Sequence, residues 1–200
     1  MGTKTPDEFF IQRVKINTTT KDMSRIEWFS PYISGKKVLH VGFVDHPITR
    51  PKKTLHRRIA PACARIDGID PNVTPEIIAA LSVPNGNIYL DWKDVPDDYD
   101  VILVPEVIEH VDNVRDFLEV LDSRKGQLII TAPCAYLWRD LGFEFSSGPG
   151  YDFIEYVHPD HNCWYSPYTL KNTIEKYSKT RKVESLHWIG GGLAAVCTKT

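Results

Sequence analysis

The sequence lacks the marks of secreted and membrane proteins. Its four cysteines are far apart and form no CxxC pair: Cys63, Cys134, Cys163 and Cys197. No apolar targeting segment is present at its start, so we expect reduced thiols in a cytoplasmic protein. No apolar run approaches the ~18 residues of a membrane-spanning helix, so no membrane association is expected.

The sequence also has little excess charge. Its 24 basic residues nearly balance 26 acidic ones, which excludes a broad electrostatic surface for nucleic acid. The one dense basic cluster, Arg50–Arg58, is either a solvated loop and helix start or a patch that meets an anionic substrate. A chain of 200 residues with 42% hydrophobic content suits one globular domain with its own core, and no oligomeric state is indicated.

Glycine is scarce in the stretch around which the chain is organised, residues 36–46. Two basic residues there lead into an apolar run that reaches Gly42 and breaks at Asp45. This pattern predicts a buried parallel strand and a turn in which the backbone passes close to another group. The loop after the first strand of such a sheet usually borders a nucleotide-like ligand. A dinucleotide fingerprint would carry three glycines here, and only one is present.

Strands and helices alternate along the rest of the chain. Apolar runs predict strands at about 37–43, 65–70, 88–90, 99–104 and 127–131, and a β-hairpin formed by 182–188 and 193–198. Helices are expected around Phe9–Val14, from Thr20 or Asp22 to Pro31, and at about 54–61. Thr74 is expected to cap a helix at about 75–81, and Ser166 to open one at about 167–177. The helical spacing at about 107–121 is expected to be re-capped at Asp112 or Asn113. The architecture expected is an α/β fold with a mostly parallel sheet and one late antiparallel strand.

We expect a single domain, in which the segments differ in role. Residues 1–35 form an N-terminal helical segment and 36–133 the ligand-binding core. Residues 134–165 are rich in aromatics and glycine, and a loop of that length is usually functional. Its aromatic residues are expected to form a wall over the substrate or to pack on the sheet: Tyr151, Phe153, Tyr156, Trp164 and Tyr165. Residues 166–200 supply the last helix and the hairpin.

Acids follow two successive predicted strands. Asp70 can accept hydrogen bonds from both hydroxyls of a ribose, although a solvated turn aspartate beside Pro71 is the alternative. Asp91 can take the exocyclic amine of an adenine, with Trp92 or Ile69 as an apolar face. Two negative charges are poor neighbours for a pyrophosphate and good ones for a cation. The pattern therefore favours an adenosine that carries positive charge.

Five segments in this order resemble the class I S-adenosylmethionine-dependent methyltransferases. They are VLHVG at 38–42, GID at 68–70, DYDVILVPEVIEHV at 98–111, GQLIITAP at 126–133 and the late hairpin, so the resemblance covers about 36–200. The resemblance is strongest for the small-molecule type of this family, whose fourth strand runs into an E-V-hydrophobic-E-H segment. HPDHNCWYSPYTL at 158–170 is similar to the H-x-x-H-x-x-x-[FY]-[ST] segment of that group.

The resemblance implies a Rossmann-like, mostly parallel seven-stranded sheet with a C-terminal antiparallel hairpin and helices on both faces. It implies S-adenosylmethionine as cofactor and a small-molecule or glycan-like acceptor. The methionine moiety would lie beside the first loop, the ribose at the second strand, the adenine at the third and the sulfonium end at the fourth. The cofactor residues implied are His40, Gly42, Phe43, Asp45, Asp70, Pro71, Asp91, Trp92, Pro105 and Glu106.

Three positions depart from the family pattern. His40 stands where an acid is usual, and Val44 and His46 stand where glycines are usual. A β-branched valine does not readily adopt φ > 0, so a different loop path is expected. Asp45 is a candidate for the displaced acid. These departures favour the rival hypothesis, a catalytically degenerate methyltransferase-like binding or scaffold protein; a nicotinamide-dependent oxidoreductase is a weaker rival.

Methyl transfer is an in-line displacement on a cationic sulfonium. It needs alignment of the acceptor with the methyl group and exclusion of water, rather than a nucleophilic triad. A hydroxyl acceptor would also need a general base, for which His110, His158 and His161 are candidates, with Asp160 orienting them. Each of these histidines is alternatively a packing or surface residue. His158, His161 and Cys163 offer only three metal ligands on one loop without a distant partner, so no metal site is predicted.

Overall fold

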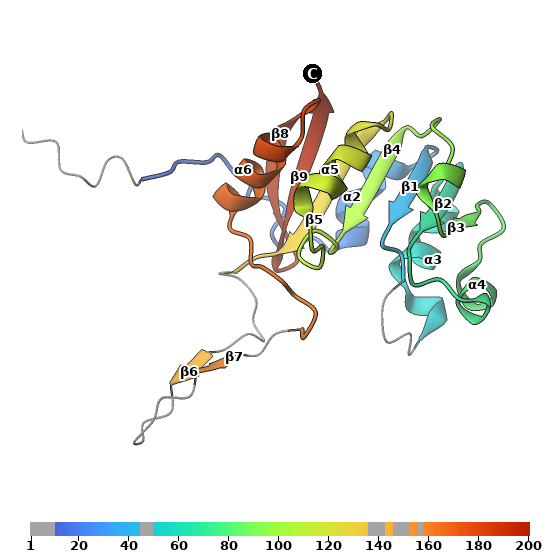
Figure 1. Ribbon diagram of the computed structural model, residues 1–200, viewed down its shortest axis with the longest axis horizontal. Helices are drawn as coiled ribbons and strands as arrows, with labels where there is room; N and C mark the ends of the chain where they lie inside the picture. Colours follow the sequence, from blue (N-terminus) through green and yellow to red (C-terminus); the bar gives the residue numbers. More distant parts are fainter. Residues whose placement is uncertain (1–10, 45–49, 136–142, 146–152, 156–157) are drawn as a thin grey trace, which may run out of the picture.

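The computed structural model describes residues 11–44, 50–135, 143–145, 153–155 and 158–200, with only the backbone in the two shortest ranges. Seven strands form one sheet in the order β3-β2-β1-β4-β5-β9-β8 (Figure 1). They are β1 Lys37–Val41, β2 Arg65–Ile69, β3 Ile88–Tyr89, β4 Val101–Pro105, β5 Gln127–Pro133, β8 Arg181–Ile189 and β9 Gly192–Lys199. The first five are parallel and β9 is antiparallel to β5 and β8, which confirms the predicted sheet.

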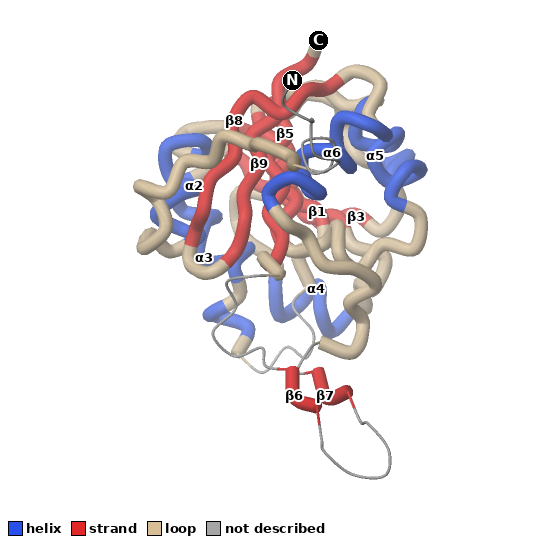
Figure 2. Tube along the Cα trace, turned by 90° about the vertical axis from the view of Figure 1, so that its left-hand side faces the viewer, coloured by secondary structure: helices blue, strands red, loops and turns tan. Residues whose placement is uncertain are grey.

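Helices cover both faces of this sheet. The α-helices are α2 Arg25–Ile33, α3 Leu55–Ile59, α4 Pro75–Leu81, α5 Val114–Asp122 and α6 Pro167–Tyr177, and the 3₁₀ turns are η1 Pro51–Lys53, η2 Ala60–Ala62 and η3 Trp92–Asp94. Within the segment predicted to be a loop, β6 Phe143–Phe145 and β7 Phe153–Glu155 pair as a separate two-stranded sheet (Figure 2).

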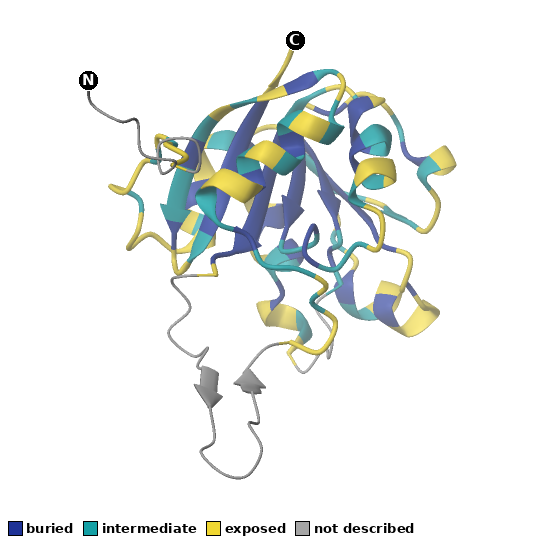
Figure 3. Ribbon diagram, turned by 60° about the vertical axis from the view of Figure 1, so that its left-hand side comes forward, coloured by how far each residue is buried: buried dark blue, intermediate teal, exposed yellow. Residues whose placement is uncertain are grey.

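The core has two layers because side chains of each strand alternate between the faces. Leu39 and Ile102 pack with the side chains of α5 and α6, whereas Val38 and Leu103 pack with those of α2 and α3. Figure 3 shows the buried sheet enclosed by helices whose outer faces are exposed. In the described part of the chain, no helix is long and apolar enough to cross a bilayer.

The helix starts depend on capping residues. Thr74 and Ser166 cap α4 and α6, as predicted, and each is followed by proline at the first helical position. Helix α2 begins later than predicted, because Ser24 and Glu27 form a capping box. It also continues past Pro31, which lies in the last turn, where proline removes a single backbone hydrogen bond.

Two further predicted helices differ from the structure. The helical spacing expected from Val107 gives a helix only from Val114, because the chain first passes through turns after β4. Asn113 caps this helix, as one of the two residues predicted to do so. Of the helix expected at Phe9–Val14, residues 9 and 10 lie outside the described residues and Ile11–Val14 is not helical.

The outer edge of β8 is covered by the segment before α2. The backbone N–H of Asn17 donates to the Leu186 carbonyl at 2.8 Å, and the N–H of Trp188 donates to the Asn17 carbonyl at 2.9 Å. This single residue therefore bonds the free edge of the last strand as an isolated parallel bridge with His187.

Candidate functional site

A cavity of about 680 Å³ opens at the carboxyl ends of β1, β2 and β4. Strand β1 lies between the other two, so the chain order reverses there, and such a switch point is the usual ligand site of an open α/β sheet. The lining residues come from the strand tips, the loops after them, the starts of α2 and α3, and the segment around residue 160: Arg25, His40, Gly42, Val44, Leu55, Asp70, Pro71, Asn72, Pro105, Glu106, Val107, His110, Val111, His158 and Asp160.

The loop after β1 depends on Gly42. Its φ is 67°, in the left-handed region, and a Cβ there would lie 2.3 Å from Cγ2 of Val107. Only glycine therefore allows the tips of β1 and β4 to approach this closely. In the described part of the chain Glu106 is the only non-glycine residue with positive φ, so Val44 avoids the conformation that its branched side chain disfavours.

Asp70 joins the loops after β1 and β2. Its side chain is 4% exposed, and its carboxylate accepts hydrogen bonds from the backbone N–H of Val44 at 3.2 Å and of Asn72 at 2.9 Å. Each carboxylate oxygen has two lone pairs, so a carboxylate that lines the cavity can accept hydrogen bonds from ligand hydroxyl groups. The residue that the sequence assigned to a ribose thus lines the cavity in a fixed orientation.

His40 and His56 form a buried pair at the base of the cavity. Their Nδ1 atoms are 3.3 Å apart and their rings stack with centroids 5.3 Å apart. Burial lowers the pKa of His40 well below its usual range and lowers the pKa of His56 to about 4. Both rings are therefore neutral at pH 7, and a neutral imidazole stands where the family pattern has a negative charge.

Glu106, directly after β4, has a strained backbone. Its φ is 54°, and its carboxylate accepts a hydrogen bond from Oγ1 of Thr131 at 2.8 Å. The guanidinium of Arg25, at the start of α2, lies 3.8 Å from the same oxygen. Burial raises the pKa of Glu106, and Arg25 opposes that shift. Backbone strain of this kind is concentrated at binding sites.

Glu109 is a buried acid behind the cavity wall. It is 1% exposed, and neither carboxylate oxygen has a hydrogen-bond partner among the described residues. Burial first, and repulsion from Glu106 second, raise its pKa to about 8. Its Oε1 lies 3.9 Å from Nε2 of the neighbouring His110. An acid this poorly satisfied calls for a functional explanation.

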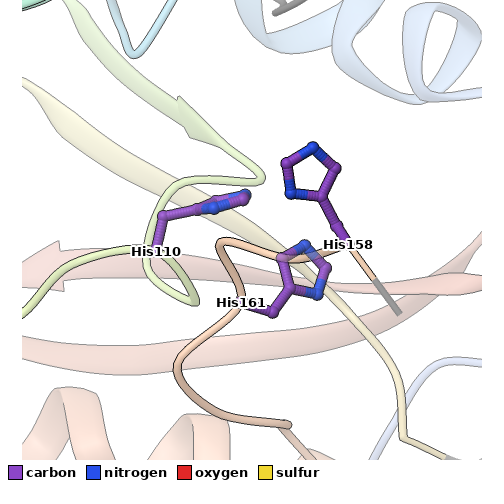
Figure 4. A group of neighbouring side chains, drawn as sticks. All are labelled: His110, His158 and His161. Atoms are coloured by element: carbon purple, nitrogen blue, oxygen red, sulfur yellow. The ribbon is translucent and has the colours of Figure 1, made fainter. Parts of the chain in front are cut away.

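Three histidines meet beside this acid. His110 follows β4, His158 and His161 come from the segment before α6, and one ring nitrogen of each lies within 4.8 Å of the others (Figure 4). Burial lowers the pKa of His110, and burial together with the neighbouring rings lowers the pKa of His161 to about 4. The three candidate bases are therefore brought together, although Cys163 is not part of the group.

Other predicted residues lie away from the cavity lining. Phe43 is buried beneath Gly68, and Asp45 and His46 fall outside the described residues. The exposed carboxylate of Asp91 forms an ion pair with Lys93 at 2.9 Å, and the ring of Trp92 stacks on the Arg124 guanidinium. Of the predicted aromatic wall, Trp164 contacts the His161 ring and Tyr165 is buried, while the side chains of Tyr151, Phe153 and Tyr156 fall outside the described residues.

Sequence reasoning missed three residues of this region. Arg25 is a basic residue in the first turn of a helix, where the dipole favours acids, and that mismatch was a usable signal. Glu109 interrupts an otherwise apolar stretch, which also marks it. His56 carries no such signal, because only the packing of α3 against β1 brings it to His40.

The chemistry available is that of an acidic cavity with one nearby cation. The carboxylates of Asp70 and Glu106 line this cavity together with the Arg25 guanidinium. Such a site suits a cationic ligand with hydroxyl groups better than a pyrophosphate.

Solved structures share this fold. No protein-family model and no curated protein matches the sequence. An S-adenosylmethionine-dependent methyltransferase from Mesorhizobium loti is 10% identical with a TM-score of 0.54, over 86% of this chain and 94% of that one. A Sulfolobus solfataricus protein assigned as a type 11 methyltransferase is 15% identical with a TM-score of 0.55, over 87% and 90%. A Listeria monocytogenes protein assigned as an S-adenosylmethionine-dependent methyltransferase is 13% identical with a TM-score of 0.52, over 88% and 95%.

Proposed function

We propose that this chain, which has the fold of the class I methyltransferases, is an S-adenosylmethionine-dependent methyltransferase that acts on a small-molecule or glycan-like acceptor. The observation that carries the proposal is the cavity at the tips of β1, β2 and β4, where Gly42, Asp70 and Glu106 meet. A position at the switch point of the sheet is where a nucleoside-containing ligand binds in such folds.

The residues present fit this cofactor. Asp70 offers a fixed, nearly buried carboxylate for the ribose hydroxyls, and Gly42 leaves room for close approach to the backbone. The acidic lining attracts a cationic sulfonium and repels a pyrophosphate, which argues against a dinucleotide. When bound, S-adenosylmethionine supplies an electrophilic methyl group on sulfur.

The contribution of the chain to methyl transfer is alignment and shielding. Strand-tip residues orient the donor, and the segment around residue 160 closes the acceptor side of the cavity. His110 and His158 line that side, where a neutral imidazole can accept the proton of an acceptor hydroxyl. Residues 134–165 are proposed to form much of the acceptor side.

A second candidate is a binding or scaffold protein that has lost catalysis. The observations that favour it are Val44 in place of a glycine and the neutral His40 in place of an acid. Both changes weaken contacts expected for the methionine ammonium. This alternative predicts that the cavity holds no S-adenosylmethionine.

The test is calorimetric titration of the purified protein with S-adenosylmethionine, S-adenosylhomocysteine and NAD. Micromolar binding of the first two, without binding of NAD, is the expected result. A folded sample that binds none of them overturns the proposal in favour of the scaffold protein. Binding of NAD alone would favour an oxidoreductase.

A further inference from the structure

We propose that His110, His158 and His161 bind a divalent transition metal, of which Zn²⁺ is the natural case, at the acceptor side of the cavity. The ligand nitrogens lie within 4.8 Å of one another and come from two segments far apart in the sequence (Figure 4). His110 supplies the distant ligand that the loop of His158 and His161 lacks.

The ligand set indicates the kind of metal. Imidazole nitrogen suits zinc, cobalt, nickel, copper and iron, whereas magnesium and calcium take oxygen ligands. Three protein ligands with an open fourth position are typical of catalytic zinc, while structural zinc sites have four protein ligands. The three-histidine group therefore corresponds to a site that keeps a position for water or substrate.

The hydrogen bonds at Asp160 bear on which ring nitrogens bind. Nδ1 of His110 lies 3.2 Å from the Asp160 carbonyl oxygen, which can only accept, so the proton is on Nδ1 and the Nε2 lone pair is available. Nδ1 of His158 accepts from the Asp160 backbone N–H at 3.3 Å, a long contact that a metal would replace. Tetrahedral Zn–N bonds of 2.0–2.1 Å place ligand nitrogens about 3.3 Å apart, so the rings must rotate toward one another on binding.

Glu109 is an independent observation for this site. It is 1% exposed, its two carboxylate oxygens have no hydrogen-bond partner within the described residues, and one oxygen lies 3.9 Å from His110 Nε2. A buried carboxylate costs stability unless a charge or donor offsets it. A cation bound to Nε2 of His110 would lie close to this oxygen and would supply a positive charge that offsets the carboxylate.

The position of the site suggests its use, a point that rests on the proposed methyltransferase function. His110 and His158 line the cavity, so the open metal position faces the acceptor. The acceptor class that follows is one that presents a hydroxyl group. With a metal bound, these histidines would be ligands rather than bases. The acceptor O–H bond would break and its proton would pass to solvent. The oxygen would use the freed electron pair to bond the methyl carbon, while the C–S bond of S-adenosylmethionine breaks and leaves its electrons on sulfur.

The experiment is titration of untagged, chelator-treated protein with Co²⁺ followed by visible absorption, and with Zn²⁺ followed by calorimetry. One equivalent of bound metal and the intense bands of four- or five-coordinate cobalt are expected. His161→Gln should weaken binding at least 100-fold, and Glu109→Gln, which keeps the shape, about 10–100-fold. Circular dichroism checks that each variant is folded.

His187→Gln is the matched control. His187 lies on β8, with Nε2 3.0 Å from Oγ of Ser185, outside the three-histidine group, so its variant should bind metal like the wild type. Folded wild type without stoichiometric metal, or equal binding by wild type, His161→Gln and Glu109→Gln, overturns the proposal. Because S-adenosylmethionine titration of the chelated protein is a separate measurement, failure of the metal site and failure of the methyltransferase function are distinguishable.

Discussion

Asp67 and Asp70 lie three positions apart on β2 and its continuation, yet they serve opposite ends of the sheet. Asp67 is fully buried: it accepts hydrogen bonds from the Tyr99 hydroxyl at 2.6 Å and from the Asn87 backbone N–H at 2.8 Å, and it pairs with Arg65 at 3.3 Å. Asp70 has backbone partners at the rim of a cavity. The first acid holds strands together, and the second lines the cavity.

The same contrast separates the two ends of the parallel strands. At the amino ends, Asp98 pairs with both Lys37 and Arg65. At the carboxyl ends, Glu106 has a left-handed backbone and Glu109 has no hydrogen-bond partner in the described residues. Stabilising ion pairs are therefore concentrated at the amino ends of the strands. The backbone strain and the unsatisfied acid that accompany a preformed binding site lie at the carboxyl ends.

The largest effect is expected at the amino end. Asp67→Ala leaves the Tyr99 hydroxyl and the Asn87 N–H without their acceptor and Arg65 with Asp98 alone, and it should lower the free energy of unfolding by about 3–5 kcal/mol. Urea denaturation measures the loss. Tyr99→Phe, which removes one hydrogen bond to the buried carboxylate, should cost less, about 1.5–3 kcal/mol. The remaining folded Asp67→Ala protein should bind S-adenosylmethionine normally; loss of binding would contradict the division between the two ends.

Gly42→Ala should produce the next largest loss. The left-handed backbone costs an alanine about 1–2 kcal/mol, and overlap of its Cβ with Val107 adds about 1–3 kcal/mol. Val107→Ala makes room for the new methyl group but leaves the backbone strain. The double variant should therefore recover part of the stability measured by urea denaturation, and strictly additive losses would contradict the contact between these residues.

Acidification should weaken the protein through the buried histidine pair. The pKa of His56 is about 4 in the folded protein and 6.5 as its reference value. Below pH 6.5, His56 is protonated in the unfolded chain but stays neutral in the folded protein. The free energy of unfolding therefore falls as the pH is lowered from about 6.5 to about 4, by about 3 kcal/mol in total. The positive charge of Arg57 lowers the pKa of His56 in the same direction as burial, and the neutral ring of His40 stacks on it. Urea denaturation of His56→Gln over the same pH range should show a flatter profile, and an unchanged profile would contradict the assignment.

Asp70→Ala tests the carboxyl end directly. Loss of hydrogen bonds to a charged acceptor should weaken S-adenosylmethionine binding by about 1.5–3 kcal/mol in calorimetry. Asp67→Asn is the control from the same strand, because its carboxylate lies among Arg65 and Tyr99 rather than in the cavity lining. Unchanged affinity in Asp70→Ala would remove this acid from the site.

Asp91→Asn should have the smallest effect. This carboxylate is exposed and already accepts the Lys93 backbone N–H at 2.9 Å, so its contact with an adenine would be worth less than about 1 kcal/mol. Calorimetry under the conditions used for Asp70→Ala gives the comparison. A loss equal to that of Asp70→Ala would extend the binding site to β3.

The sequence predicted the parts of this molecule that depend on local pattern. Apolar runs of strand length located the strands, and the caps Thr74 and Ser166 located two helix starts. Asp70 was identified because it follows a strand whose direction was predictable. The convergence of His110 with His161, and the reach of Arg25 to Glu106, depend on tertiary packing that no local pattern encodes. Asp91 follows a strand as Asp70 does, but η3 begins there and uses the carboxylate as a helix cap.

The bridge at Asn17 affects how readily one copy of the protein associates with another. An uncovered edge strand is a template on which another chain can add a strand, the first step toward aggregates. Asn17 occupies the two backbone groups of β8 at Leu186 and Trp188 that such a chain would use. The segment before α2 thus acts as a guard against self-association. A protein that lacks this segment is expected to lose solubility while the cavity keeps its shape.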